Sequence, residues 1–347
     1  MSTTLVRPSQ LGQILAKTIP TQLPVLITGA PGIGKSDIVT QAAKAANAEI
    51  IISHPAVADP TDVKGLPWVA NDAIHATFLP YGDLHRAITA TKPTVWFLDD
   101  LGQAPASVQA GYMQLLLARQ VGEHVLPDCI SFIAATNRRV DRAGVSGILE
   151  PVKSRFTTIL ELSPTLDDWC SWAIASNVPS EVIAYLRFQP DFLQKFNPTA
   201  DLVNSPSPRT WANLGKLLNL GLPKEMEVMA FAGAVGEEAA VNFTSFLRLY
   251  RDLPNPDAIM MAPDSAIIPK EISTLYAVST ALAARANANN FSRVMTYLER
   301  LEQNGYAEYS VLCIRDALLR DKNITTSPAF IKAMSGHFGQ LINGGTI

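Results

Sequence analysis

Five short apolar runs, rich in β-branched and aromatic residues, mark the first half of the chain. They are Val25–Thr28, Ile50–Ser53, Thr94–Leu98, Ile130–Ala135 and Thr157–Leu162. Most of them are continuous rather than alternating, which is typical of strands that helices cover on both faces. Helix-favouring stretches lie between them, at Asp37–Ala46, Tyr81–Ala90 and Ser107–Ala118. This order predicts an α/β domain with a parallel five-stranded sheet between two layers of helices.

Two segments interrupt the alternation. Between Asp59 and Pro80, the pieces Trp68-Val69 and Ala73–Phe78 flank Asn71-Asp72, which predicts a β-hairpin inserted before a helix. The stretch Gln120–Pro127 predicts a second hairpin.

The second half of the chain is almost free of strand-like runs. Its helix-favouring stretches are Leu166–Ser176, Ser180–Leu186, Pro208–Leu220, Lys224–Gly233, Gly236–Leu253, Glu271–Ala288, Phe291–Asn304, Ala307–Asp321 and Ser327–Ile342. The proline-containing stretch Asn255–Pro269 favours a linker. At 347 residues the chain exceeds the usual size of a single core. We expect an α/β domain at 1–163, with inserts near 63–80 and 119–127, followed by helical regions at 164–265 and 266–347.

A glycine-rich loop follows the first apolar run. Residues 29–36 match the phosphate-loop pattern G-x-x-x-x-G-K-[ST], and both flanks agree with it, because a strand precedes the loop and a helix follows. Such glycines let backbone N–H groups turn toward phosphates, while Lys35 reaches the β- and γ-phosphates and the Ser36 hydroxyl holds Mg²⁺. The predicted nucleotide-binding residues are Gly29, Ala30, Pro31, Gly32, Ile33, Gly34, Lys35, Ser36 and Asp37.

Polar residues end two of the later strands. The third strand ends in Asp99-Asp100, where Asp99 would bind Mg²⁺, directly or through water, and Asp100 would orient or deprotonate the attacking water. The alternative is an acidic pair that caps the next helix. The fourth strand leads into Asn137, whose amide could position water, although Asn is also a common turn residue.

Composition narrows the classes of function. The net charge of -3 and the pI near 6.0 argue against a nucleic-acid binder dominated by phosphate contacts. Cys129, Cys170 and Cys313 lack metal-ligand spacing and are expected to be buried thiols in a reducing compartment. Met1–Gln10 lacks a signal-type apolar stretch, and no uncharged apolar run approaches the ~20 residues of a membrane span. We therefore expect a soluble, cytoplasmic protein without membrane partners.

The order of these motifs resembles that of the AAA+ ATPases and, more narrowly, of their MoxR-like branch. The resemblance covers about residues 9–250. Besides the phosphate loop, Asp99-Asp100 and Asn137, it rests on further segments: Asp59–Gly65, Leu101–Pro105, Leu115–Leu117, Arg138-Arg139, Ala143–Val145, Ser154–Phe156 and Ser207–Arg209. The resemblance implies that Lys35 and Ser36 belong to Walker A, Asp99 and Asp100 to Walker B, and Asn137 to sensor 1.

Two arginines have roles that only the resemblance implies. Arg155 matches the arginine finger, which completes the active site of a neighbouring subunit, and Arg209 matches sensor 2, a lid arginine that contacts the γ-phosphate of its own subunit. The alternatives are that Arg155 caps a strand and that Arg209 is a solvated residue at a helix start. Arg138 and Arg139 are further candidates for the cation acting between subunits.

Asp100 departs from the family pattern, which usually has Glu as the second acid. The shorter side chain places its carboxylate more than an ångström further back, and a misplacement of this size can cost ~10²-fold in rate. Either a backbone shift brings Asp100 forward or turnover is slow.

The resemblance also implies a mode of action. The expected protein hydrolyses ATP to ADP and phosphate with Mg²⁺, assembles as a ring (a hexamer) and remodels or activates a partner protein, often one with a von Willebrand factor A domain. The two hairpins match inserts that face the pore or the partner, so Trp68, Val69 and Phe78 are candidate contact residues, unless they pack within their own hairpin. The alternatives are a metal-chelatase motor subunit, a nucleic-acid motor, and an ATP-gated switch with slow hydrolysis.

Overall fold

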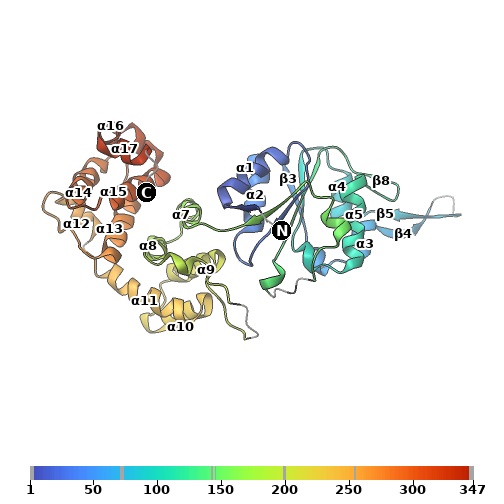
Figure 1. Ribbon diagram of the computed structural model, residues 1–347, viewed down its shortest axis with the longest axis horizontal. Coiled ribbons are helices and arrows are strands. Elements are labelled where there is room, and N and C mark those ends of the chain that lie inside the picture. Colours follow the sequence, from blue (N-terminus) through green and yellow to red (C-terminus); the bar gives the residue numbers. More distant parts are fainter. Residues whose placement is uncertain are drawn as a thin grey trace. The chain divides into compact units, whose positions relative to one another are not determined.

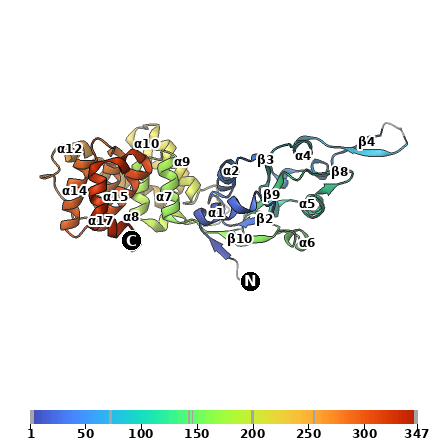
Figure 2. The ribbon, with the colours of Figure 1, turned by 90° about the horizontal axis from the view of Figure 1, so that it is seen from above.

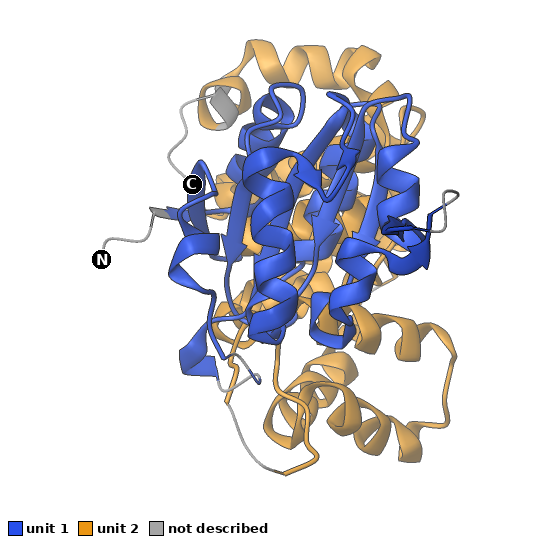
Figure 3. Ribbon diagram, turned by 90° about the vertical axis from the view of Figure 1, so that its right-hand side faces the viewer, with its two compact units in different colours: residues 1–165 blue, residues 166–347 orange. Residues whose placement is uncertain are grey.

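The computed structural model describes residues 4–70, 74–141, 144, 146–197, 201–253 and 255–343. The chain forms two compact units, residues 1–165 and residues 166–347, which Figure 3 shows in different colours. No helix among the described residues combines the length and the apolar character needed to cross a membrane.

The first unit contains a parallel six-stranded sheet in the order β1-β10-β2-β9-β6-β3. Its strands are β1 (Thr4–Val6), β2 (Val25–Thr28), β3 (Glu49–Ser53), β6 (Thr94–Leu98), β9 (Ile130–Thr136) and β10 (Thr158–Leu162). The α/β class and all five expected strands are confirmed. The expected number of strands was wrong, because β1 pairs with β10 at the sheet edge and is too short to form a recognisable apolar run.

Helices cover both faces of this sheet (Figure 1). They are α1 (Pro8–Thr18), α2 (Lys35–Ala45), α3 (Pro60–Lys64), α4 (Gly82–Ile88), α5 (Ala106–Ala118) and α6 (Glu150–Lys153). Neighbouring residues of β6 point to opposite layers: Phe97 packs in a cluster with α1 and α2, whereas Trp96 packs in a cluster with α4 and α5. Because both faces are buried, the strand is apolar throughout rather than alternating.

Both expected hairpins are present. Strand β4 (Leu66–Val69) pairs with β5 (Ala76–Leu79), and β7 (Gln120–Val121) pairs with β8 (His124–Val125). The expected turn at Asn71-Asp72 lies outside the described residues. The two hairpins contact each other: the Glu123 carboxylate accepts hydrogen bonds from the Phe78 N–H, at 3.2 Å, and from the Thr77 hydroxyl.

The second unit is helical (Figure 2). Its helices are α7 (Leu166–Ala175), α8 (Ser180–Phe188), α9 (Pro208–Asn219), α10 (Lys224–Val235), α11 (Glu237–Arg251), α12 (Pro256–Met261), α13 (Ile272–Arg285), α14 (Phe291–Gln303), α15 (Ala307–Arg320), α16 (Pro328–Ser335) and α17 (His337–Asn343). The expected linker at Asn255–Pro269 was partly wrong, because α12 lies there and buries Ile259 and Met260. The expected last helix is divided at Gly336.

Two hydrophobic clusters form inside the second unit. Helices α7 to α11 surround one of them, around Tyr185, Trp211 and Phe243. Helices α12 to α17 surround the other. Helix α13 packs against both α8 and α15, and Arg187 of α8 forms a buried ion pair with Asp316 of α15. The two clusters are therefore joined within one compact body.

Candidate nucleotide-binding site

The phosphate loop connects β2 to α2 with the backbone that its glycines permit. Gly32 and Gly34 have φ values of +75° and +91°, in the left-handed region where a side chain is strained. At Gly29 the constraint is space instead, since a Cβ atom there would lie 2.9 Å from the Leu162 carbonyl oxygen. The loop is thus tightly folded before the helix begins at Lys35.

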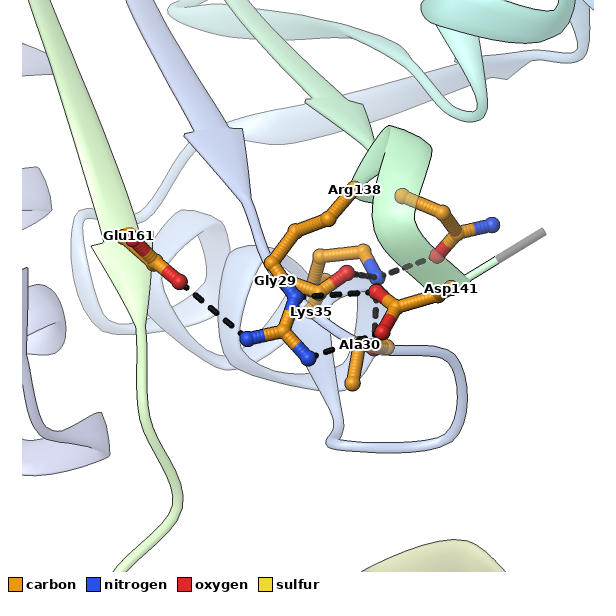
Figure 4. Close-up of polar contacts among 7 residues, drawn as sticks. Gly29, Ala30, Lys35, Arg138, Asp141 and Glu161 are labelled. Atoms are coloured by element: carbon orange, nitrogen blue, oxygen red, sulfur yellow. Dashed lines mark hydrogen bonds and ion pairs between the residues drawn. The ribbon is translucent and has the colours of Figure 1, made fainter. Parts of the chain in front are cut away.

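The Lys35 ammonium is buried at the centre of the loop. Its Nζ donates to the carbonyl oxygens of Gly29, at 3.0 Å, and Ala30, at 2.9 Å (Figure 4). It also donates to Asn137 Oδ1, at 2.7 Å. Only 7% of the residue is exposed. Anionic phosphate oxygens would form stronger, charge-assisted bonds with the ammonium than these neutral oxygens do. The loop therefore fits a phosphate chain.

Two oxygen ligands suited to a hard cation meet beside the loop. Ser36 lies in the first turn of α2, and its Oγ donates to Asp99 Oδ2 over 2.7 Å. Hydroxyl and carboxylate oxygens are the ligand types that Mg²⁺ prefers in nucleotide sites. Asp37 is exposed in the same helical turn, where its charge complements the helix dipole.

Asn137 joins Lys35 to the second acid. Its Oδ1 accepts from the Lys35 ammonium, and its Nδ2 donates to Asp100 Oδ1 over 3.2 Å. This amide orientation is the one that matches a donor on one side and an acceptor on the other. Lys35, Asn137 and Asp100 were predicted to share one site, and the structure connects them by hydrogen bonds.

Asp100 adopts a backbone conformation that most side chains avoid. Its φ and ψ angles are 59° and 35°, in the left-handed region, where Asp and Asn are the most tolerated residues after Gly. No motif in the sequence indicates this conformation.

Arg138 is engaged within its own chain (Figure 4). Its Nε and Nη2 donate to Asp141 over 2.9 Å and 2.8 Å, and its Nη1 donates to Glu161 over 3.2 Å. The hydrogen bonds to Asp141 are the main cause that raises the pKa of Arg138 above its ordinary value. Arg138 was a candidate for a cation acting between subunits, and these two carboxylates already neutralise it.

The other two arginines lie in different surroundings. Arg155 follows α6 and is partly exposed; its Nη1 donates to Ser154 Oγ, and its Nε has no partner among the described residues. Arg209 belongs to the second unit and is exposed near the start of α9. Ser207 caps this helix, because its Oγ accepts a hydrogen bond from the Thr210 N–H.

Ser53 is a polar residue near this site that was not predicted from the sequence. Ser53 ends β3, the edge strand beside β6, and its buried hydroxyl contacts Trp96 and Asp83. The available signal was a polar residue at the carboxyl end of an apolar run, because the carboxyl ends of parallel strands share one edge of the sheet.

Comparison with known proteins agrees with this geometry. Residues 24–156 match the family model described as the AAA domain of the dynein-related subfamily. The match spans the phosphate loop, the acidic pair, Asn137 and Arg155. This part of the first unit is therefore similar to AAA domains. None of the curated proteins matches the sequence.

The similar solved structures are distant in sequence. A RuvB mutant from Thermotoga maritima is 16% identical with a TM-score of 0.41, covering 86% of each chain. NtrX from Brucella abortus is 15% identical with a TM-score of 0.36, covering 89% of this chain and 67% of its own. A putative ATPase from Cytophaga hutchinsonii is 15% identical with a TM-score of 0.34, covering 84% of this chain and 75% of its own. These scores are too low to assign a function from any of the three.

Proposed function

We propose that this chain is an ATP-hydrolysing AAA+ motor of the MoxR-like type, which works as a hexameric ring and remodels or activates a partner protein that carries a von Willebrand factor A domain. The observation that carries the ATPase proposal is the set of contacts from the phosphate loop to both acids. Lys35 contacts Asn137, Asn137 contacts Asp100, and Ser36 contacts Asp99. The subtype, the ring and the partner rest on the resemblance of the motifs.

Each residue has a defined part in this proposal. Lys35 exchanges its loop carbonyl partners for phosphate oxygens, and Ser36 and Asp99 hold Mg²⁺. The metal neutralises charge on the β- and γ-phosphates when it is bound. Asp100 accepts a proton from the attacking water, and Asn137 keeps the Asp100 carboxylate in place through its Nδ2.

The backbone at Asp100 supports the idea that this shorter acid is still active. A left-handed residue directs its side chain differently from an extended one, and here the carboxylate reaches hydrogen-bond distance of Asn137. We infer that this conformation is the backbone shift that compensates for the missing methylene of Glu.

The remaining roles concern assembly and the partner. Arg155 is the proposed finger because of its motif. Of the two other candidates, Arg138 is neutralised within its own chain and Arg139 is exposed. Arg209 is the proposed sensor 2. Exposure favours a contact role for the first hairpin, since Trp68 and Val69 are each 65% exposed rather than packed within it.

Phosphate release from ATP tests the proposal. The parent protein should hydrolyse ATP only with Mg²⁺, and Lys35→Ala should abolish tight ATP binding, because it removes the cation facing the β- and γ-phosphates. Lys44→Ala is the matched control, since Lys44 is exposed at the far end of the same helix. A Lys35→Ala affinity within a few-fold of the parent would overturn the phosphate-loop assignment. ATP binding without turnover in the parent would favour an ATP-gated switch instead.

A further inference from the structure

A buried polar junction lies beneath the acidic end of the sheet. The Ser53 hydroxyl donates to Asp83 Oδ2 over 2.6 Å and accepts from the Trp96 indole N–H over 2.8 Å. Ser53 is 6% exposed, and Trp96 is fully buried. One hydroxyl therefore connects strand β3, strand β6 and helix α4.

The same residue also contacts the backbone of the proposed magnesium ligand. The Ser53 carbonyl oxygen accepts the Asp99 N–H over 2.9 Å, one step beyond the last paired residues of β3 and β6. Ser53 thus holds the start of the acidic pair with its main chain while its side chain is fixed from two sides.

Asp83 connects this junction to the first hairpin. It lies in the first turn of α4, which begins shortly after β5 ends at Leu79. Its other oxygen, Oδ1, pairs with Arg86 over 3.3 Å, and Arg86 also donates to the Ile50 carbonyl of β3 over 3.4 Å. Helix α4 is therefore attached to the edge strand at two points, and the stronger one is the charge-assisted bond to Ser53.

We propose that Ser53 and Asp83 are positioning residues for the metal site, because they fix the end of β3 and thereby the backbone of Asp99. This inference rests on the proposed ATPase function and adds a support that touches neither nucleotide nor metal. Groups that orient metal ligands typically contribute ~10–100-fold to metal affinity or activity. The phosphate loop connects β2 to α2, and two strands, β9 and β6, lie between β2 and β3, so nucleotide binding without metal should not depend on the junction.

The first variant is Ser53→Ala, which removes the hydroxyl and leaves the strand intact. Mn²⁺ serves as the probe, and its affinity for the protein–ADP complex is measured by electron paramagnetic resonance, beside kcat and KM for ATP. We expect ~10-fold weaker Mn²⁺ binding and a comparable loss of kcat, with metal-free ADP affinity within about two-fold of the parent. Ser53→Thr keeps the hydroxyl and should restore most of the Mn²⁺ affinity.

Ser131→Ala is the matched control. Ser131 is also a buried serine of this sheet, and its hydroxyl bonds one carbonyl, that of Ile19, but it lies at the opposite end of β9 from Asn137. It should lower thermal stability and leave Mn²⁺ affinity unchanged. Asp83→Asn provides a second test that preserves size: it weakens the acceptor and should give an intermediate loss of Mn²⁺ affinity.

The outcomes separate this inference from the proposed function. A parent protein that binds neither ADP nor Mn²⁺ would overturn the proposed function. The positioning role alone would be overturned if the parent binds both ADP and Mn²⁺ and the Ser53→Ala and Asp83→Asn proteins bind Mn²⁺ as tightly as Ser131→Ala does. If Ser53→Ala does not fold, Asp83→Asn decides the question alone.

Discussion

The buried ion pair between α8 and α15 allows the loss of stability on breaking it to be predicted for the second unit. Arg187 Nη1 and Nη2 donate to the two oxygens of Asp316 over 2.5 Å and 2.7 Å. The side chains are 9% and 2% exposed. Burial alone would lower the pKa of Arg187, but the bonds to Asp316 raise it above its ordinary value, so the guanidinium stays charged. We consider the variant Asp316→Ala, which removes the carboxylate only.

The expected cost follows from this burial. Removing one member of a buried pair leaves an uncompensated charge, which costs about 3–5 kcal/mol in the free energy of unfolding. For a unit of this size, that corresponds to a Tm lower by roughly 6–20 °C. Replacing both members, Arg187→Met with Asp316→Leu, removes the charge as well as its partner, and the double variant should lie within about 1 kcal/mol of the parent or above it.

Urea unfolding followed by tryptophan fluorescence is a suitable assay, because Trp169, Trp172 and Trp211 all lie in the second unit. The matched control is Asp257→Ala, which breaks an exposed pair with Arg285 at a similar distance of 2.7 Å. Surface pairs contribute about 0–1 kcal/mol, so this control should hardly change the midpoint.

Two results would refute this reasoning. One is a loss in the free energy of unfolding for Asp316→Ala that is no larger than the loss for the Asp257→Ala control. The other is a double variant as unstable as Asp316→Ala alone, which would mean that shape rather than charge decides the stability of this contact.

Three further predictions concern the site and the thiols. Asp100→Asn should keep ATP binding and stop turnover, since Asn tolerates the left-handed backbone but accepts no proton; an undiminished rate of phosphate release would make Asp100 structural. Mixing Arg155→Ala with Lys35→Ala should restore part of the ATPase activity, because a mixed ring places an intact site beside an intact finger; co-assembly by light scattering without recovery would exclude action in trans. Burial raises the pKa of the Cys170 thiol to about 12, whereas the thiol of the unfolded chain loses its proton at pH ~8.5. The free energy of unfolding should therefore fall as the pH rises from the unfolded pKa toward the folded one. Mass spectrometry after alkylation at pH 9 should find Cys170 unmodified in the native protein and modified in urea.

The sequence predicted the sheet well where burial is strongest. Strands β6 and β9 are covered on both faces and read as unbroken apolar runs. It failed at β1, whose three residues pair with β10 more than 150 residues later in the chain, because no local pattern indicates such a pairing. Helix α12 was missed because proline at its first turn resembles a linker, although proline is favoured at that position.

The candidate site was predicted in its parts but not in its connections. Fixed spacing identified Lys35 and Ser36, and strand ends identified the acids and Asn137. The orientation of Asn137 between Lys35 and Asp100 depends on neighbouring strands meeting at one edge. The pairing of Arg138 with Asp141 and Glu161 depends on the same packing, as does the junction at Ser53. These are contacts between distant segments, which a motif does not encode.

The strand order has a consequence for how the chain is made. Strand β2 lies between β9 and β10, and β1 pairs with β10 at the edge of the sheet, so β1 and β2 are synthesised long before the strands that pair with them. At a synthesis rate of ~5–20 residues per second, Val6 and its partner Leu162 are made roughly 8–30 s apart. Strand β2 has no sheet partner until β9 emerges, and its other edge stays unpaired until β10 is made. Until then the phosphate loop also lacks the contact with Leu162. A nascent chain of this protein should therefore depend on holding factors until residue 162 has emerged, and only then become able to retain nucleotide.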